Sequence, residues 1–521
     1  MKNTLSVLCL VFVWAMSSAV WAEPTGNGLS QVPSTAASSD SVASSKPHRL
    51  TIGGYGEAVN NFVNTMSAVV WAEPTGEGPS QVASTASAGS LAQSKSRRST
   101  KGGYGEAVYN FARAMSSSDS VASSKPHRLT IGGYGEAVYN YNFYSSNVFR
   151  YTYHDRYADA KGHGRVDLPH AVLMLGYDFG HGWSFGTEIE FEHGGVETAI
   201  EIEQEETGEY EKEIERGGEV ALEQFWLQKS FAPNLNLRVG HIVVPVGALN
   251  KSHLPTEFFG VYRPEGEFTI LPSTWHETGV SLWGRLPGWN YEVMLVPSLN
   301  STMFNMSGWV NGGSASAYEF RVANRLAAAG RLDYVGIPGL RLSLSGFVGN
   351  TFNNDIDERS GARYDTIRGT VLIGSFDFLY RRGRLVVRGN ADAGYLGDAG
   401  TVNSVNQRLN GQTGAPYPRT QVGERAYAVG LEAGYNVLSA RRADKRLFLF
   451  GRYDLYDSFI PVSGMLDAEW TRRQCLLAGV NYYPIPQIAV KAEVGYRWFA
   501  SQYNNEPFVA LGITWSGLFE R

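Results

Sequence analysis

The chain has 521 residues, with 59 glycines, 12% aromatic residues, two cysteines and a formal net charge of −5. A soluble chain of this length would form roughly two or three domains, whereas a single large transmembrane barrel uses the same length in one unit. Abundant glycine and aromatic residues suit the turns and aromatic girdles of such a barrel. The small net charge gives no reason to expect nucleic-acid binding, which needs concentrated Lys and Arg.

The first residues have the pattern of a secretory signal peptide. Lys2 supplies a positive charge, residues 5–15 are apolar, and small residues precede a cleavage site after Ala22. We therefore expect residues 1–22 to be a signal peptide, with an uncleaved membrane helix as the alternative. After cleavage only Cys475 remains, so no intrachain disulfide can form.

Residues 23–127 contain an internal duplication. The segment 21–26 returns at 71–76, and 45–52 returns at 124–131. The residues between the copies are rich in Ser, Ala and Thr and bury too little apolar surface to offset chain entropy. We expect 23–127 to be a low-complexity, mostly disordered periplasmic extension; a repeat solenoid is the alternative.

From residue 128 to residue 521 the dominant pattern is an alternation of apolar and polar residues. In 488–498, for example, Val490 and Val494 alternate with Lys491 and Glu493. Such segments run for about ten to fifteen residues, the length that a tilted strand needs to cross a bilayer. No stretch after the signal reaches the ~18 consecutive apolar residues of a membrane helix, so a membrane would be crossed by strands.

The connections between these segments alternate in length. Short turns are expected at 180–182, 232–234, 287–288, 337–339, 382–383, 440–445 and 484–487, and long polar loops at 144–165, 194–218, 250–273, 301–325, 351–365, 398–424, 460–468 and 500–506. This alternation predicts a closed antiparallel transmembrane β-barrel of about 16 strands, with short periplasmic turns and long extracellular loops. A soluble all-β sandwich is the alternative fold.

The same alternation predicts which side chains line the lumen. The wall candidates are Glu188, Glu190, Arg238, Arg341, Arg388, Arg452, Lys491, Glu493 and Arg497. Any one of them could be a solvated or paired wall residue, but together they favour a polar, wet interior. A barrel of about 16 strands is wide enough for a water-filled channel, so passive diffusion of small polar or ionic solutes is expected.

Catalytic and cofactor chemistry is not expected. Ser252 and His253 are adjacent and would point apart, and His276 with Glu277 lacks the second histidine of a helical zinc site. We therefore expect no enzyme, no metal site and no cofactor. The alternative function is a non-conducting surface adhesin or receptor, in which the barrel only anchors the loops.

The third long loop and its flanks carry a resemblance to a known family. Pro245 to Gly247, Asn250 with His253 and Pro255, Gly260-Val261 with Arg263-Pro264-Glu265, and Trp275 to Gly279 keep their spacing. Together they resemble the phosphate-selective porin family of Gram-negative outer membranes, over roughly 128–521 and most densely over 219–300.

The resemblance implies a sixteen-stranded barrel in outer-membrane lipid, usually a homotrimer, whose third loop folds inward and narrows the channel. By resemblance, the constriction candidates in this loop are Lys251, His253, Arg263, Glu265 and Glu267.

Two departures argue against a phosphate preference. The inward set mixes both signs, whereas the phosphate-selective members line the lumen with Lys and Arg. The second long loop is also strongly acidic, with Glu201, Glu203, Glu205, Glu206, Glu209, Glu211, Glu213 and Glu215. It would repel anions, bind divalent cations, or be simply a solvated charge run.

Overall fold

The computed structural model describes residues 128–193, 201–204, 210–213, 220–315, 321–354, 364, 366–410, 420–438 and 445–520. The predicted signal peptide at 1–22 and the duplicated extension at 23–127 lie outside these residues, and both stay predictions. Among the described residues, no helix has the length and apolar character needed to cross a membrane.

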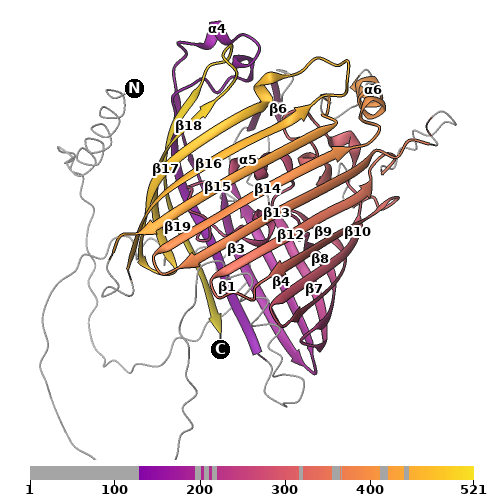
Figure 1. The fold of residues 1–521 in the computed structure, drawn as a ribbon, viewed down its shortest axis with the longest axis vertical. Helices are drawn as coiled ribbons and strands as arrows, with labels where there is room; N and C mark the ends of the chain where they lie inside the picture. The colour runs from indigo at the N-terminus through magenta and orange to yellow at the C-terminus, as the bar shows by residue number, and fades with distance from the viewer. Residues whose placement is uncertain are drawn as a thin grey trace, which may run out of the picture. The chain divides into compact units, whose positions relative to one another are not determined.

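The strands form one antiparallel sheet that closes on itself (Figure 1). They are β1 (Arg128–Asn142), β2 (His163–Asp167), β3 (His170–Gly180), β4 (Trp183–Glu192), β7 (Val220–Ala232), β8 (Leu235–Val243), β9 (His276–Leu286), β10 (Trp289–Pro297), β11 (Leu326–Tyr334), β12 (Leu340–Asn350), β13 (Thr370–Arg382), β14 (Leu385–Leu396), β15 (Arg425–Asn436), β16 (Arg446–Ile460), β17 (Arg472–Ile485), β18 (Ile488–Trp498) and β19 (Glu506–Glu520). Pairing of β1 with β19 closes the ring.

The ring has sixteen positions although seventeen strands belong to the sheet. Strands β2 and β3 pair with successive parts of β1, at Val138–Asn142 and Arg128–Gly135, so they share one position and 17 − 1 = 16. The break between them contains Pro169, which has no N–H to donate to a strand neighbour. The predicted fold class, a closed barrel of about 16 strands, is confirmed.

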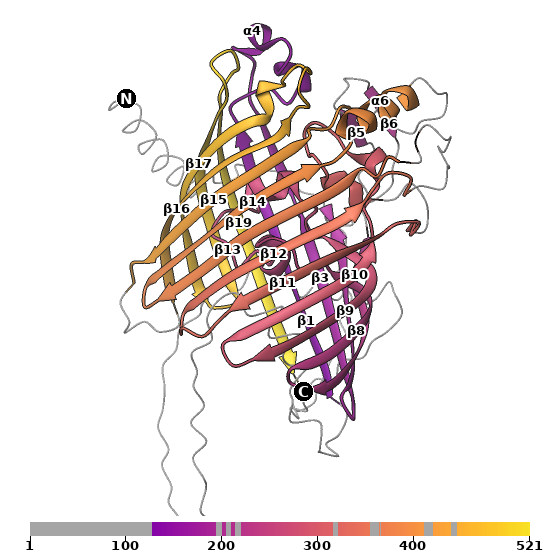
Figure 2. The same cartoon turned by 45° about the vertical axis from the view of Figure 1, so that its right-hand side comes forward.

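The helices lie in the long connections, towards one end of the barrel or inside it (Figures 1 and 2). They are η2 (Val148–Arg150), α4 (His154–Tyr157), η4 (Leu249–Lys251), α5 (Glu265–Ile270), η5 (Ser301–Met303), η6 (Asn311–Ser314), α6 (Ala399–Asn410) and η8 (Glu469–Thr471). The second long loop carries a separate hairpin of β5 (Glu201–Gln204) and β6 (Tyr210–Glu213). The side chains of its acidic run lie outside the described residues, so the role predicted for them is not tested.

The alternation of short turns and long loops agrees with the sequence prediction except near the C-terminus, where the β15–β16 connection (437–445) is longer than the β18–β19 loop (499–505). Most of the predicted turn at 440–445 lies outside the described residues. Elsewhere, for example, strands β9 and β10 are joined by Pro287 and Gly288, where the glycine takes a φ of 76°. The third long loop is longer than predicted, because β8 ends at Val243 and β9 begins at His276. We call residues 244–275 loop 3.

The outer face of the barrel is apolar. Its exposed side chains include Val239, Val280, Val293, Leu332, Leu344, Leu372, Val429, Leu449, Leu476, Val490 and Leu511. Exposed aromatic residues, such as Trp183, Phe231 and Trp289, lie beside the short turns. An apolar belt with an aromatic edge is the surface of a barrel embedded in lipid.

The interior is polar but is not wet throughout, which corrects the sequence prediction. On strand β18, Lys491 and Glu493 point inward as predicted, yet they are only 1% and 2% exposed. Long connections fold into the barrel and build an apolar cluster there, which includes Leu254, Ile270, Trp275, Leu299, Phe304, Trp309, Phe352 and Val402. Part of the lumen is therefore filled by protein, because these loops carry apolar side chains that need burial.

Candidate functional site

Loop 3 crosses the interior and is held against the wall formed by β15 to β18. The backbone N–H of Phe259 donates to Glu432 on β15 at 3.2 Å, and that of Val261 donates to Glu493 on β18 at 2.8 Å. Buried backbone groups need such partners, and charged acceptors make strong ones. Inward carboxylates of the wall therefore fix the path of the loop.

A lysine and an asparagine of the same wall donate hydrogen bonds to the carbonyl oxygens of the loop. Lys491 Nζ donates to the oxygen of Phe258 at 3.0 Å and to that of Gly260 at 2.6 Å. Asn481 Nδ2 donates to the oxygen of Phe259 at 2.8 Å. Four wall residues thus bind the main chain of 258–261, so the loop's path depends on the strands as well as on its own sequence.

The ring of Phe259 packs into the same wall. Its centroid lies 5.0 Å from that of Phe448 and 5.5 Å from that of Phe450. Glycine at position 434 makes room for it, because a Cβ there would lie 2.3 Å from the ring.

Helix α5 makes a second attachment to the wall. Arg497 Nε donates to both carboxylate oxygens of Glu265, at 2.7 and 2.8 Å, and the hydroxyl of Tyr456 also donates to Glu265. Burial acts to raise the pKa of Glu265, but the adjacent Arg497 outweighs it and holds that pKa below its usual value. Glu265 is therefore a charged anchor.

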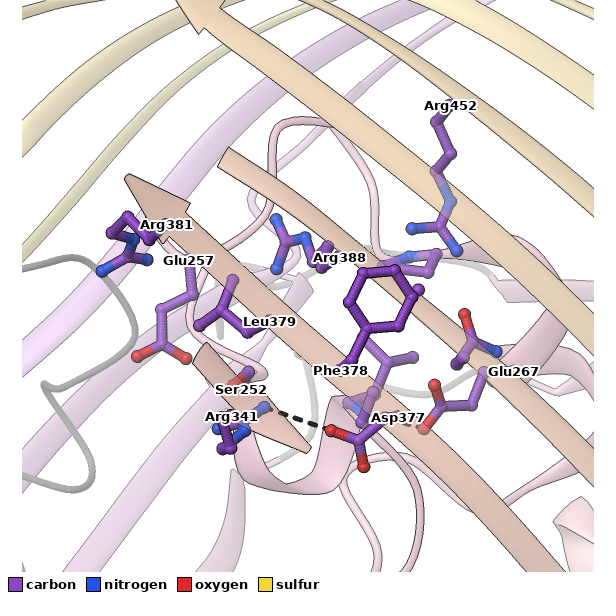
Figure 3. A pocket seen from close by; sticks show the side chains of 15 residues that line it. Ser252, Glu257, Glu267, Arg341, Asp377, Phe378, Leu379, Arg381, Arg388 and Arg452 are labelled. Carbon is purple, nitrogen blue, oxygen red and sulfur yellow. Dashed lines mark hydrogen bonds and ion pairs between the residues drawn. The ribbon is translucent and has the colours of Figure 1, made fainter. Parts of the chain in front are cut away.

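A narrow cleft with a volume of about 30 Å³ remains between loop 3 and the wall formed by β12 to β16 (Figure 3). Glu257 and Glu267 border it from the loop. We call the opposite side the arginine wall, which consists of Arg341, Arg381, Arg388 and Arg452. Strand alternation directs these arginines inward, so acids and guanidinium groups face each other across the cleft.

The arginines are paired along the wall but differ in exposure. Arg388 Nε donates to Glu432 at 2.6 Å, and Arg341 donates to Asp377 at 3.3 Å. The side chains of Arg341 and Arg388 are 21% and 15% exposed, whereas that of Arg452 is 4% exposed. Arg341 and Arg388 are therefore better placed than Arg452 to act on an ion in the remaining space.

The two loop acids of the cleft favour the protonated form more than an ordinary glutamate. Burial raises the pKa of Glu257, against the opposing charges of His253 and neighbouring arginines. Burial and the charge of Asp392 raise the pKa of Glu267 well above its usual value. Neither carboxylate oxygen of Glu257 makes a hydrogen bond, so this group is held only by its charge environment.

The five predicted constriction residues do not meet at one point. Glu267 borders the cleft, and Lys251 forms an ion pair with Glu292 of β10 at 2.5 Å. Glu265 binds Arg497, as described above. His253 and Arg263 act on a group of acidic residues on a different part of the wall.

The predicted wall residues divide into several roles. Arg341, Arg388 and Arg452 border the cleft, Lys491, Glu493 and Arg497 hold loop 3, and Glu188 and Glu190 belong to the acidic group. Arg238 instead bonds to Gln228 and lies 4.4 Å from the ring centroid of Trp226.

Sequence reasoning missed Glu257, Asp377 and Arg381. The alternation through β13 places Asp377 and Arg381 on its inward face and could have found both residues. Arg381 lies beside the predicted turn at 382–383, which hid its role. Glu257 gives no such signal, since it lies in an irregular loop.

No family model matches the chain. A protein of Aquifex aeolicus (strain VF5) described as uncharacterized is 27% identical over 361 residues, which cover 67% of this chain and 74% of that protein. Among solved structures, the anion-selective porin from Comamonas acidovorans gives a TM-score of 0.45 at 11% identity and covers 75% of this chain and 100% of its own. The outer-membrane channel DcaP of Acinetobacter baumannii gives 0.43 at 13% identity, covering 76% of this chain and 99% of its own.

At these scores the likeness adds nothing to the topology described above. The closed antiparallel ring, its apolar belt and its alternating connections themselves define an outer-membrane β-barrel of the porin type. Such a barrel belongs in the outer membrane of a Gram-negative bacterium.

Proposed function

We propose that the chain is a porin that lets small polar or ionic solutes diffuse through the cleft between loop 3 and the arginine wall. The single observation that carries the proposal is the inward course of loop 3, whose acids face four arginines across that cleft. In this proposal loop 3 is the constriction of the channel. The residues that border the cleft take the place of the five loop residues that the family resemblance implied for the constriction.

We further propose that the constriction prefers anions. Arginine stays charged at every accessible pH, whereas burial raises the pKa of Glu257 and Glu267. Four arginines border the cleft against the three acids Glu257, Glu267 and Asp377, so the balance there is positive, and a cationic constriction lowers the barrier for anions. Membership of the phosphate-selective family and assembly as a homotrimer remain part of the proposal.

The test is single-channel conductance of the purified, refolded full chain in a planar bilayer. We expect stepwise conductance, and a reversal potential under a KCl gradient that has the sign of an anion-preferring pore. A barrel that shows the gel mobility shift of a folded porin and inserts without conducting would contradict the proposal. That result would favour the adhesin or receptor alternative.

A further inference from the structure

A group of buried acidic residues lies on the inner face of β1, β4 and β7. We call Glu136, Glu188, Glu190 and Glu223 the acidic wall; they are 6%, 0%, 2% and 1% exposed. Arg263 acts electrostatically on three of them, and Lys491 acts on Glu136. Four carboxyl groups therefore share two strong cations in a place from which water is excluded, which is costly unless further positive charge is present.

A β-bulge creates the densest part of this wall. Glu188 on β4 pairs with Gln224 on β7, but the next residue, Ile189, pairs with Leu222, so Glu223 is the extra residue. The bulge directs Glu223 inward beside Glu188, where strict alternation would have directed it to the lipid.

Loop 3 contributes an imidazole to the same point. One ligand atom each from Glu188, Glu223 and His253 lies within 4.8 Å of the other two. His253 Nε2 lies 3.9 Å from Glu188 Oε1, and His253 is 1% exposed. Three separate elements thus bring two carboxylates and one imidazole together.

Several atoms of this group make no well-directed hydrogen bond. They are the ring nitrogens of His253, whose nearest hydrogen-bonding group is the backbone of Asn250, and Oε1 of Glu188. A buried polar atom without a partner costs about 1–3 kcal/mol, and more if it is charged. A cation among the three side chains would bind one ring nitrogen of His253 and Oε1 of Glu188 at the same time.

The remaining carboxylate oxygens are held by neutral donors. Gln224 Nε2 donates to Glu188 Oε2, the hydroxyl of Tyr134 donates to Glu223 Oε2 at 3.2 Å, and that of Thr274 donates to Glu223 Oε1. Hydrogen bonds of this kind orient the ligands of metal sites.

We infer that Glu188, Glu223 and His253 form a binding site for a divalent transition-metal cation such as Zn²⁺. One imidazole and two carboxylates are ligands that such cations accept. The site joins loop 3 to β4 and β7, so the metal fastens the loop to the acidic wall. The inference stands apart from the proposed channel function, because binding requires no conduction.

The neighbouring group of His170, Glu190 and Glu192 also has ligand atoms within 4.8 Å of one another. It is the weaker candidate, because His170 Nδ1 already lies 2.5 Å from Glu190 Oε1. The two groups can be separated by mutation.

The test uses the full chain, denatured with a chelator and refolded with Zn²⁺ or Co²⁺, because the site is enclosed after folding. We expect a single equivalent of Zn²⁺ per chain to remain after gel filtration in detergent, and the Co²⁺ form to show visible absorption bands. His253→Gln and the isosteric Glu223→Gln should each lose at least tenfold in retained metal. A chain refolded without metal gives the baseline.

The matched controls are His170→Gln, in the neighbouring group, and His276→Gln, at the first residue of β9. Both variants should retain the metal. The gel mobility shift shows which variants fold, and Glu188→Gln replaces any variant that does not. Failure of the native chain to retain Zn²⁺, retention by folded His253→Gln and Glu223→Gln, or loss in His170→Gln would each overturn the inference.

Discussion

Loop 3 meets the acidic wall and the arginine wall in different ways. Against the acidic wall it presents His253, and the carboxyl groups beneath it are at most 6% exposed. Against the arginine wall it leaves a cleft, where Arg341 and Arg388 keep 21% and 15% of their side chains exposed. Acidic groups are thus buried under the loop, whereas the most exposed charges beside the cleft are those of Arg341 and Arg388, since Glu257 and Glu267 are only 8% and 1% exposed. The charges that govern an ion's passage are those left in contact with water, so total lumen charge is a poor guide to selectivity.

The largest effect is expected when the attachment of loop 3 is broken. In Lys491→Met the carbonyls of Phe258 and Gly260 lose their donor, and the buried carboxylates of Glu136 and Glu493 lose a cation. Removing one partner from a buried charged network costs about 3–5 kcal/mol. We expect that loss in urea unfolding, together with a larger and noisier single-channel current, because the acidic wall becomes open to water.

A smaller loss of stability is expected from a conservative substitution at the same contact. Glu493→Gln keeps an oxygen that can accept from the N–H of Val261, so it should cost about 1 kcal/mol. Equal losses in Lys491→Met and Glu493→Gln would argue that the lysine does not hold the loop.

Removal of the exposed arginine charges tests the other wall. In a variant with Arg341, Arg381 and Arg388 each changed to Gln, we expect the anion-to-cation permeability ratio to fall about tenfold. A unit charge ~4 Å from an ion is worth about 1 kcal/mol even at the dielectric constant of water. Reversal potentials under a KCl gradient measure the ratio. Arg384→Gln, at the exposed turn between β13 and β14, is the control and should leave the ratio unchanged.

A smaller effect is expected from a change of pH. Because burial raises the pKa of Glu257 and Glu267, both groups take up protons as the pH falls, while the arginines stay charged. The anion preference should therefore rise as the pH is lowered, by less than the change expected for the arginine variant. Glu257→Gln should show a flatter pH profile and a higher preference at alkaline pH. A preference that fell with decreasing pH would contradict this assignment.

The smallest effect is expected on the acidic wall. Glu190 is 2% exposed and lies beneath loop 3, so Glu190→Gln should leave the permeability ratio unchanged within error. The variant keeps an amide oxygen beside His170 and removes one charge from a crowded acidic group, so the free energy of unfolding in urea should change by less than about 1 kcal/mol. A change in selectivity as large as that of the arginine variant would show that solutes reach both walls.

The fold could be predicted because its signals are local. The alternation in 488–498 and the turn at Pro287-Gly288 each depend only on residues close together in the sequence. Because such strands and turns recur along the chain, the sequence predicts a closed ring. The start of loop 3 was placed too late, at residue 250. The apolar residues Val244 and Val246 suggest a continuing strand in the sequence, but in the structure they pack in the interior cluster.

The site was only partly predictable because it depends on distant contacts. Alternation identified Arg341, Arg388 and Arg452, since these lie on regular strands. It could not show that Glu257 faces them, or that a bulge directs Glu223 inward beside Glu188. These contacts between distant residues depend on how the loop packs and on the register of the strands. The sequence pattern of a single segment shows neither of them.

Closure of the ring also sets the order in which the chain can assemble. Thr130 near the start of β1 pairs with Glu520 at the end of β19, and loop 3 is held by residues of β15, β17 and β18. The first strand of the barrel therefore waits unpaired on one side until the last has been made, and exposes an edge that other chains could pair with. Pairing across such a sequence distance is slow. The chain therefore needs protection from aggregation from the time of its export until the final strand completes the barrel.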